Sequence, residues 1–314
     1  MRSFLINGNG LVATPKWEPN CWVNIVKPTQ EDKEFALETL GVPLAFYEDI
    51  EDVDERPRIE IEDGWTFILM RLPCKVEEDE TTAPFTTVPL GIMFKDDVFV
   101  SVCFYKTDII SDFINHTKRK GIKRTDNVNF IFRLLLSSSV WFLKYLKQIK
   151  SRALLAENQL EQSIRNEDLQ TLLKLEKCLV YFTTSLRGND MLTHRLKNMR
   201  SYQDVYDPEL VEDVEIESKQ ALEMTNIYSD IFSGMTETYA SVISNNLNIV
   251  MKRLTTISIV LMLPTLIASY FGMNLEKGTT IFNNLFLIVI VISIVLTIIT
   301  AYFLLRNGGS KKLK

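Results

Sequence analysis

Small polar side chains recur along one face of an apolar segment near the C-terminus. These residues, here called the polar stripe, follow one another at alternating steps of three and four: Asn248, Met251, Thr255, Ser258, Met262, Thr265, Ser269 and Gly272. Such spacing places side chains on one side of an α-helix. Neutral hydroxyl, amide and carbonyl oxygens suit a hard cation that keeps much of its hydration shell. The stripe therefore indicates an ion pathway, although hydroxyls at this spacing are equally typical of helix contacts inside a membrane.

The elements that carry this stripe are long enough to cross a membrane. The only two long, mainly apolar and uncharged stretches cover residues 254–275 and 279–305. A helix needs about 20 such residues to cross ~30 Å of hydrocarbon. We therefore predict transmembrane helices at about 254–272 and 281–305, joined by an external loop at 273–280.

Charges on either side of these spans predict their orientation. Lys252 and Arg253 precede the first span, and the tail at 306–314 is basic. The positive-inside rule then places both termini in the cytoplasm. Polar residues interrupt the first turns after Met1, so no secretory signal is expected. We predict a multi-pass protein of the cell membrane, in contact with the lipid bilayer.

The first span is expected to continue a helix that begins in the cytosolic part. After Pro208 the next helix-disfavouring residue is Gly234, and the following one, Pro264, already lies inside the span. One helix over 208–272 would be on the order of 95 Å long at ~1.5 Å per residue. A single chain cannot bury one face of such a rod, and two spans cannot enclose an aqueous path. Both arguments predict a homo-oligomer with cyclic symmetry.

The residues before this helix divide into two patterns. Segment 1–124 alternates strand and helix signals, including a capping box at 29–32 and a hairpin at 90–104, and predicts an α/β domain with a small mixed sheet. Segment 125–207 predicts an antiparallel pair of helices, at about 126–165 and 167–200, followed by an acidic stretch. The fold class expected for the whole chain is α+β.

The acidic stretch is dense. Residues 204–217 contain no basic residue and seven acids, namely Asp204, Asp207, Glu209, Glu212, Asp213, Glu215 and Glu217. Such a cluster repels itself unless cations bind, although most acidic runs are simply solvated helix faces.

Other classes of function find little support. His116 and His194 are the only histidines, and neither a P-loop nor a GxSxG motif occurs, so no enzyme activity is predicted. The four cysteines have no CxxC spacing and are expected to be reduced. A net charge of -5, with basic residues gathered at the membrane border, argues against nucleic acid as a partner.

The end of the first span carries a recognisable signature. The sequence Tyr270-Phe271-Gly272-Met273-Asn274 closes the first of two C-terminal spans, after a long charged helix. In this position the Gly-Met-Asn tripeptide resembles the signature of the CorA family of Mg2+ channels and transporters. The resemblance covers most of the chain, with the acidic segment 44–58 and the pre-membrane helix 239–251. It implies a homopentamer whose long helices form a funnel.

The resemblance also implies roles for individual residues. Gly272, Met273 and Asn274 would form the external mouth, where oxygen dipoles hold a hydrated ion; otherwise they are a helix C-cap. Met251 and Leu254 would form an apolar gate. Glu276 would add a carboxylate collar outside the mouth, or else be a solvated loop residue.

A regulatory Mg2+ site is implied in the cytosolic part. The family senses intracellular Mg2+ with carboxylates between subunits, so Glu48 and Asp49 would face an acid of a neighbouring subunit. Asp204 is the closest match to that acid, and Asp213 is the alternative. Mg2+ bound there would hold the gate shut by stabilising the closed state.

Two other functions stay open. A Zn2+ or other transition-metal transporter of the same superfamily would favour imidazole or thiolate ligands, which the polar stripe lacks, and this favours Mg2+ with Co2+ or Ni2+ as surrogates. A membrane-anchored scaffold or sensor would need only a tether. Pro264, one position later than usual, and Ser269, where glycine is frequent, depart from the family pattern and leave the pore radius open.

Overall fold

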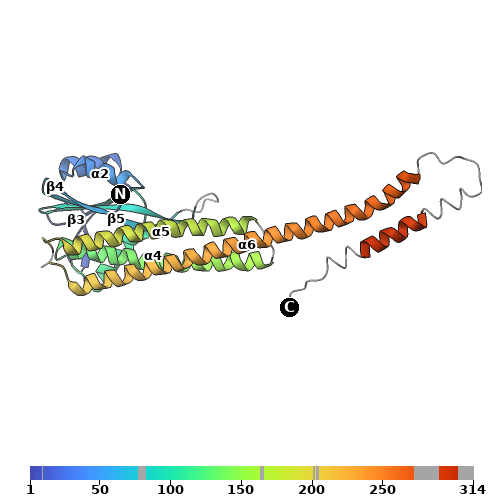
Figure 1. Cartoon of the computed structure of the whole chain (residues 1–314). Helices are drawn as coiled ribbons and strands as arrows, with labels where there is room; N and C mark the ends of the chain where they lie inside the picture. The colour runs from blue at the N-terminus through green and yellow to red at the C-terminus, as the bar shows by residue number, and fades with distance from the viewer. Residues whose placement is uncertain are drawn as a thin grey trace, which may run out of the picture. The chain divides into compact units, whose positions relative to one another are not determined.

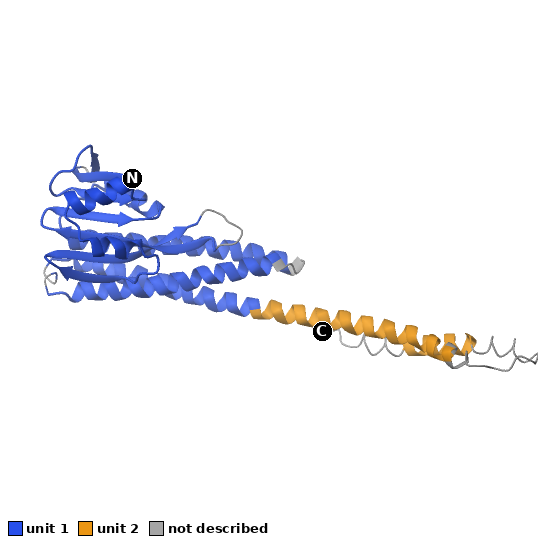
Figure 2. Cartoon of the chain, turned by 90° about the horizontal axis from the view of Figure 1, so that it is seen from above, with its two compact units in different colours: residues 1–236 blue, residues 237–314 orange. Residues whose placement is uncertain are grey.

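The computed structural model describes residues 1–8, 10–76, 83–162, 166–200, 202, 205–271 and 290–302. The chain divides into two compact units, Met1–Thr236 and Glu237–Lys314 (Figure 2). The first unit holds a sheet, the helices on both of its faces and the first part of helix α6 (Pro208–Phe271). The described part of the second unit holds the rest of α6 and a short apolar helix, Ile290–Tyr302.

The first unit is built on one mixed sheet of seven strands over the described residues. In chain order the strands are β1 (Arg2–Gly8), β2 (Gly10–Thr14), β3 (Trp22–Val26), β4 (Arg58–Glu62), β5 (Trp65–Lys75), β6 (Phe85–Lys95) and β7 (Val98–Cys103). Their order in the sheet is β2-β1-β3-β7-β6-β5-β4. Only β3 and β7 run parallel, and this pair joins the N-terminal hairpin to the β4–β7 meander. The mixed sheet predicted from the sequence is confirmed.

Local signals explain the hairpins. Lys95 pairs with Val98, and the tight turn between them places Asp96 at a positive φ of 47°, so the predicted hairpin is present. Strand β5 contains Pro73, while β6 contains Pro89. Both prolines lie where the strand has a paired neighbour on one side only, where a missing N–H is tolerated.

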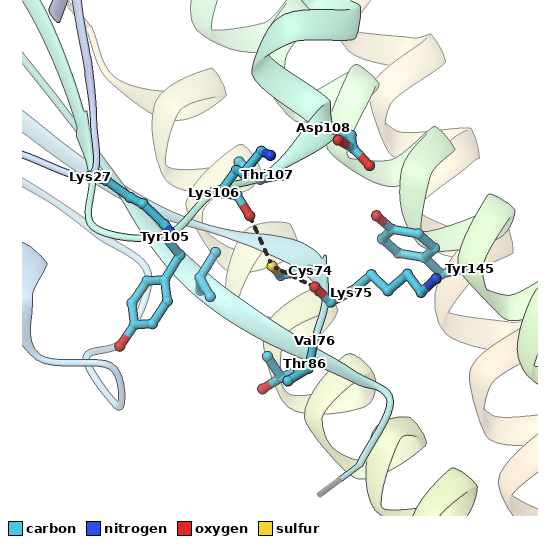
Figure 3. A pocket seen from close by; sticks show the side chains of 11 residues that line it. Lys27, Cys74, Lys75, Val76, Thr86, Tyr105, Lys106, Thr107, Asp108 and Tyr145 are labelled. Carbon is cyan, nitrogen blue, oxygen red and sulfur yellow. Dashed lines mark hydrogen bonds between the residues drawn. The ribbon is translucent and has the colours of Figure 1, made fainter. Parts of the chain in front are cut away.

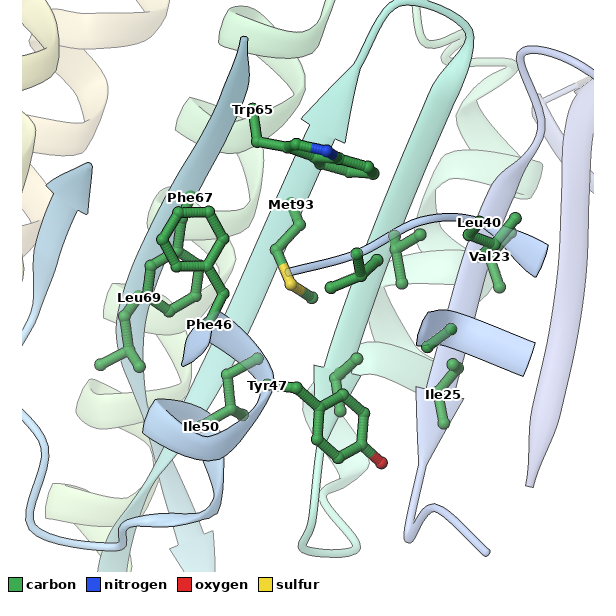
Figure 4. Close-up of a cluster of buried hydrophobic side chains, with 14 of the residues drawn as sticks. Val23, Ile25, Leu40, Phe46, Tyr47, Ile50, Trp65, Phe67, Leu69 and Met93 are labelled. Carbon is green, nitrogen blue, oxygen red and sulfur yellow. The ribbon is translucent and has the colours of Figure 1, made fainter. Parts of the chain in front are cut away.

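One face of the sheet is covered by α1 (Gln30–Glu34), the π-helical turn η1 (Phe35–Thr39) and α2 (Leu44–Glu51). The predicted capping box starts α1, since Asp32 N donates to Thr29 Oγ1 at 3.3 Å and Thr29 N donates to Asp32 Oδ2 at 3.1 Å. Beneath α2, the ring of Phe46 stacks on Phe67 with centroids 4.6 Å apart (Figure 4).

The opposite face carries α3 (Asp108–Lys120), α4 (Asn127–Gln162) and α5 (Asn166–Asn198), whereas α2 lies across the sheet from them (Figure 1). α4 and α5 correspond to the two long helices expected from the periodicity. Between them Phe142 packs against Phe182, with ring centroids 5.0 Å apart. Leu160, Leu172 and Leu175 are buried, as expected for the apolar faces through which two such helices pack. Leu155 is 62% exposed and lies on the outer face of α4.

Arg71 fastens the sheet to the helices through its main chain. Its N–H donates to Asn189 Oδ1 at 2.9 Å, and Asn189 Nδ2 donates back to the Arg71 carbonyl at 2.8 Å. Ser138 of α4 donates to the same carbonyl at 3.2 Å. β4 stops pairing with β5 at Leu69, so the Asn189 amide takes the place of the missing strand neighbour.

The Arg71 side chain holds the acidic loop that follows α2. Its guanidinium donates to the Thr87 carbonyl at 2.8 Å and to the carbonyls of Val53 and Glu55. Burial lowers the pKa of Arg71, yet the neutral acceptors around it provide the hydrogen bonds that a desolvated guanidinium needs. The loop is therefore tied to β5 and β6.

α6 is covered over only part of its length. Its buried face toward the helical pair comprises Leu210, Val211, Val214, Ser218, Ala221, Thr225, Tyr228 and Phe232. From Ser233 onward, none of the α6 residues whose exposure is described is buried. The long helix predicted over 208–272 is thus observed over Pro208–Phe271, with its second half uncovered within the chain.

Gly91 of β6 is the contact point of α2 on the sheet. A Cβ at this position would lie 2.1 Å from Ile50 Cδ1. We expect Gly91→Ala to destabilise the full-length protein by about 1–3 kcal/mol through overpacking. Thermal unfolding followed by tryptophan fluorescence would measure the loss. In Gly91→Ala/Ile50→Ala the added methyl fills the space that Ile50 leaves, so the double variant should lose less than the sum of the two single variants; strict additivity would contradict the contact.

Candidate ion pathway and its cytosolic charges

The polar stripe lies on α6, and its described members are all exposed within a single chain. Met251, Leu254 and Met262 are 65%, 63% and 67% exposed, respectively. The structure finds one described helix long and apolar enough to cross a membrane, Pro208–Ile267, and no residue of its apolar window is buried. Within the part of the chain that the structure describes, this length of helix is therefore left uncovered.

The hydroxyl groups of the stripe share one hydrogen-bond pattern. Thr255 Oγ1 donates to the Met251 carbonyl at 2.9 Å, and Ser258 Oγ donates to the Leu254 carbonyl at 3.0 Å. Thr265 Oγ1 likewise donates to a carbonyl one turn earlier, at 3.1 Å. A hydroxyl has a single proton, so each group that donates inside the helix offers only lone pairs outward. At Thr255, Ser258 and Thr265 the stripe thus presents acceptor lone pairs outward, which suit a cation.

The spacing of the stripe has a geometric consequence for packing. Alternating steps of three and four average 3.5 residues per turn, the heptad value. An ideal straight helix has 3.6 residues per turn, so a stripe of period 3.5 stays in contact with a common axis only if the helices coil around it with a left-handed twist. The stripe therefore has the period of a seam between packed helices.

Several predicted site residues lie outside the described residues. These are Gly272, Met273, Asn274 and Glu276 at the expected external mouth, and Asp204 of the expected cytosolic site. Of the second expected span, the structure describes only the helix Ile290–Tyr302.

The expected regulatory acids of α2 have an unexpected neighbour. Asp49 accepts a hydrogen bond from Arg58 Nη2 at 2.5 Å, and the same guanidinium binds Glu55 and, through Nε at 2.7 Å, Glu60. Burial raises the pKa of Asp49, the nearby Glu55 and Glu60 raise it further, and Arg58 acts against them. Glu48, in contrast, points into solvent as an exposed residue. Three carboxylates thus share one guanidinium, an excess of negative charge that sequence reasoning missed.

The acids of α6 are also partly compensated. Glu215 accepts from Lys197 Nζ at 2.7 Å, and His194 Nδ1 lies 3.8 Å from the same carboxylate. This hydrogen bond to Glu215 raises the pKa of Lys197. The acidic stretch contains no base of its own, but α5 supplies one across the helix contact. Asp213 is exposed, and no described ion pair involves it.

A single chain does not bring the predicted regulatory acids together. Asp49 lies on α2 and Asp213 on α6, and the sheet separates α2 from the long helices (Figure 1). Among the described residues, no group of three or more acidic, histidine or cysteine side chains is spaced to hold a metal ion. An ion shared by α2 and α6 would need α6 of another subunit.

Comparison with known proteins identifies a family. The model of the CorA-like Mg2+ transporter proteins matches residues 17–306. The cobalt/magnesium transport protein CorA of Methanocaldococcus jannaschii is 24% identical over 293 residues, covering 91% of this chain and 90% of its own. CorA of Thermotoga maritima is 26% identical over 273 residues, covering 81% of this chain and 73% of its own.

Solved structures share the fold. The complete structure of the M. jannaschii magnesium transporter superposes with a TM-score of 0.79 at 21% identity, covering 96% of both chains. The cytoplasmic domain of ZntB from Vibrio parahaemolyticus superposes with a TM-score of 0.57 at 12% identity, covering 79% of this chain and 98% of its own. The similarity to the M. jannaschii structure supports the predicted architecture of an N-terminal α/β domain followed by long helices.

The Arg58 cluster generates a test. Arg58→Gln leaves Asp49, Glu55 and Glu60 without their shared counter-charge, so we expect a lower melting temperature in the purified full-length protein. Added Mg2+ should raise the melting temperature of this variant more than NaCl does at matched ionic strength. The rise should also be larger than the rise that Mg2+ causes in the parent protein. Arg56→Gln, an exposed neighbour with no described ion pair, is the matched control and should change neither value. Equal Mg2+ stabilisation of all three proteins would show that Arg58 does not neutralise the cluster.

Proposed function

Since the chain belongs to the CorA-like family of Mg2+ transporter proteins, we propose that it is a subunit of an oligomeric channel that carries divalent cations, Mg2+ first among them, across the cell membrane. The relatives M. jannaschii and T. maritima CorA are named cobalt/magnesium transport proteins, so Co2+ is a natural second cargo and Ni2+ a further surrogate. No enzymatic step is part of this function.

The observation that carries the proposal is a row of outward-facing hydroxyl acceptors on an exposed helix. Thr255, Ser258 and Thr265 turn lone pairs outward, at turns of α6 that no described residue of the chain buries. A helix that only anchors a scaffold in the membrane would need an apolar surface, but it would not need hydroxyl groups at regular helical spacing. Copies of α6 arranged around a common axis would line it with rings of neutral oxygens, and a hydrated divalent cation passes such rings without shedding its shell.

The assembly follows from the same helix. One copy of α6 cannot enclose water, whereas a closed ring of copies with the stripe inward can. The 3.5-residue period supports a left-handed coil of these helices. The family resemblance supports five copies, with the remaining faces of α6 against neighbouring helices and lipid, and with both termini in the cytoplasm.

Entry and gating are assigned to the two ends of the stripe. Gly272, Met273 and Asn274 form the external mouth, with Glu276 as a collar that raises the local cation concentration. At the cytoplasmic end Met251 and Leu254 close the path by dewetting, and their exposure within one chain leaves both side chains available to line a narrow ring. Asn248, Ser269 and the members between them line the path.

Intracellular Mg2+ regulates the gate in this proposal. Glu48 and Asp49 of one subunit face Asp213, or Asp204, of the next, and bound Mg2+ bridges them in the closed state. The sheet between α2 and α6 within one chain supports a site between subunits. Asp49 already pairs with Arg58, so Mg2+ at Asp49 must compete with this guanidinium. Loss of Mg2+ loosens the ring through carboxylate repulsion.

Zinc is the second candidate cargo, supported by the shared fold of the ZntB cytoplasmic domain. Zn2+ prefers imidazole and thiolate ligands, and the stripe offers neither. Selectivity then depends on hydration and size, for which rings of neutral oxygens discriminate weakly among divalent ions. Mg2+ is favoured because its strongly held water shell needs only outer hydrogen bonds.

Ion flux into proteoliposomes tests the function. We expect the parent protein to pass Mg2+ in preference to Zn2+, and Asn274→Ala to reduce Mg2+ flux by about tenfold or more, because the mouth loses its amide oxygens. Thr255→Val should also reduce flux. Thr256→Val is its matched control, since Thr256 makes the same 2.9 Å bond to a preceding carbonyl but lies off the stripe. Unchanged flux in Asn274→Ala and Thr255→Val would remove these residues from the path, whereas no flux in the parent would favour a membrane-anchored scaffold.

Regulation has its own test. Replacing Glu48, Asp49, Asp204 and Asp213 together by their amides should leave transport intact but remove most of its inhibition by internal Mg2+, because no carboxylates remain to bridge the subunits. Flux is measured at low and high Mg2+ inside the vesicle. Amide replacement of Glu31, Glu34, Glu38 and Glu62, four exposed acids outside the proposed site, provides a charge-matched control. Inhibition that persists unchanged in the four-site variant would reject these acids as the sensor.

A further inference from the structure

A cavity of about 760 Å³ opens in the first unit, away from α6 and from the Arg58 cluster. It lies where the ends of β5 and β6 meet the loop before α3, with Tyr145 of α4 at one side (Figure 3). Its size falls within the range of ligand pockets, ~300–1,000 Å³. None of the transport residues proposed above lines it, so the cavity is without a role in that function.

The cavity concentrates positive charge in an acidic protein. Among the described residues that line it, Lys27, Lys75 and Lys106 come from three separate segments and Asp108 is the one acid. These residues carry a charge of 3 − 1 = +2 in a chain of net charge -5. None of the three ammonium groups has an ion pair within 4 Å among the described residues. Figure 3 shows Lys75 extending toward Tyr145 and Lys27 toward Tyr105, on opposite sides of the residues drawn.

The walls of the cavity are apolar and firmly held. The Cys74 thiol donates to the Lys106 carbonyl at 3.4 Å and so joins the end of β5 to the loop before α3. Tyr145 is fixed by Phe85 and Trp141, at 5.0 and 5.4 Å between ring centroids. Tyr105 is 36% exposed and offers a ring face beside the lysines. An aromatic surface next to clustered ammonium groups fits a ligand that is part apolar and part anionic.

The lysines of the cavity offer an anion more than the start of α3 does. Thr107 caps this helix by accepting the Ile109 N–H at 3.2 Å, which satisfies one of the groups that an anion would otherwise bind. Lysine ammonium groups act as point charges on phosphate oxygens, whereas carboxylates are better matched by the planar fork of arginine, which the cavity lacks. We propose that this cavity binds a small phosphorylated molecule with an aromatic body, of the nucleoside phosphate class.

Calorimetric titration of the purified full-length protein tests the proposal. ATP in EDTA is the probe, so that no divalent cation contributes, and pyrophosphate and adenosine are titrated separately. We expect ATP to bind more tightly than either fragment. Lys75→Gln/Lys106→Gln should weaken ATP binding by about tenfold, a loss of ~1.4 kcal/mol. Lys16→Gln/Lys123→Gln, which removes the same charge from exposed positions outside the cavity, should leave it unchanged.

A second variant separates the two parts of the ligand. Tyr105→Ala should weaken ATP and adenosine binding but not pyrophosphate binding. Absence of ATP binding at millimolar concentration overturns the proposal, as does equal weakening in the two lysine pairs, which would mean non-specific attraction. Pyrophosphate that binds as tightly as ATP, together with no effect of Tyr105→Ala, overturns the nucleoside class. Melting temperatures equal to the parent's verify that the variants fold.

Discussion

The structure depends on one imbalance: α6 is longer than the chain can cover. At ~1.5 Å per residue its 64 residues extend about 96 Å, and its burial against the helical pair ends at Phe232. Beyond this point apolar side chains and a stripe of acceptor oxygens are exposed together. Lipid can cover the apolar faces, but hydroxyl lone pairs gain nothing from hydrocarbon. Water, a cation or another helix is the better partner for the stripe, and the proposed ring of α6 copies provides all three.

Two arginines of the first unit have opposite surroundings. Arg71 is surrounded by neutral carbonyls and positions the acidic loop, whereas Arg58 is surrounded by three carboxylates and neutralises only part of their charge. A guanidinium is tethered, while Mg2+ exchanges with solvent. If Mg2+ bridges subunits at Asp49, its affinity is set by what it gains there beyond the Arg58 contact. In that case the ion pair between Asp49 and Arg58 sets the Mg2+ concentration above which the regulatory ion binds.

The sheet separates these functions in space. α2 and its acids lie on one face, while the long helices α4 and α5 lie on the other (Figure 1). Communication between α2 and the pathway within one chain passes through β5 and β6, where Arg71, Asn189 and Ser138 join sheet and helices. The cavity lined by Lys27, Lys75 and Lys106 lies where β5 ends and β6 begins. A ligand there would contact the layer that connects the acids with α6.

The sequence alone determined the long helix, the polar stripe, the two apolar stretches and the CorA signature, because these depend on period, length and local order along one segment. It also predicted the 95–98 turn, which follows from local pairing, and a mixed sheet, whose one parallel pair, β3 with β7, joins residues far apart in the chain. It did not predict the partners of the acids: Arg58 reaches Asp49 only through the turn before β4, and Lys197 reaches Glu215 only through the packing of α5 on α6. The lysine cavity likewise joins residues 27, 75 and 106. Only the tertiary structure decides such contacts, because charges distant in sequence become neighbours when strands and helices pack.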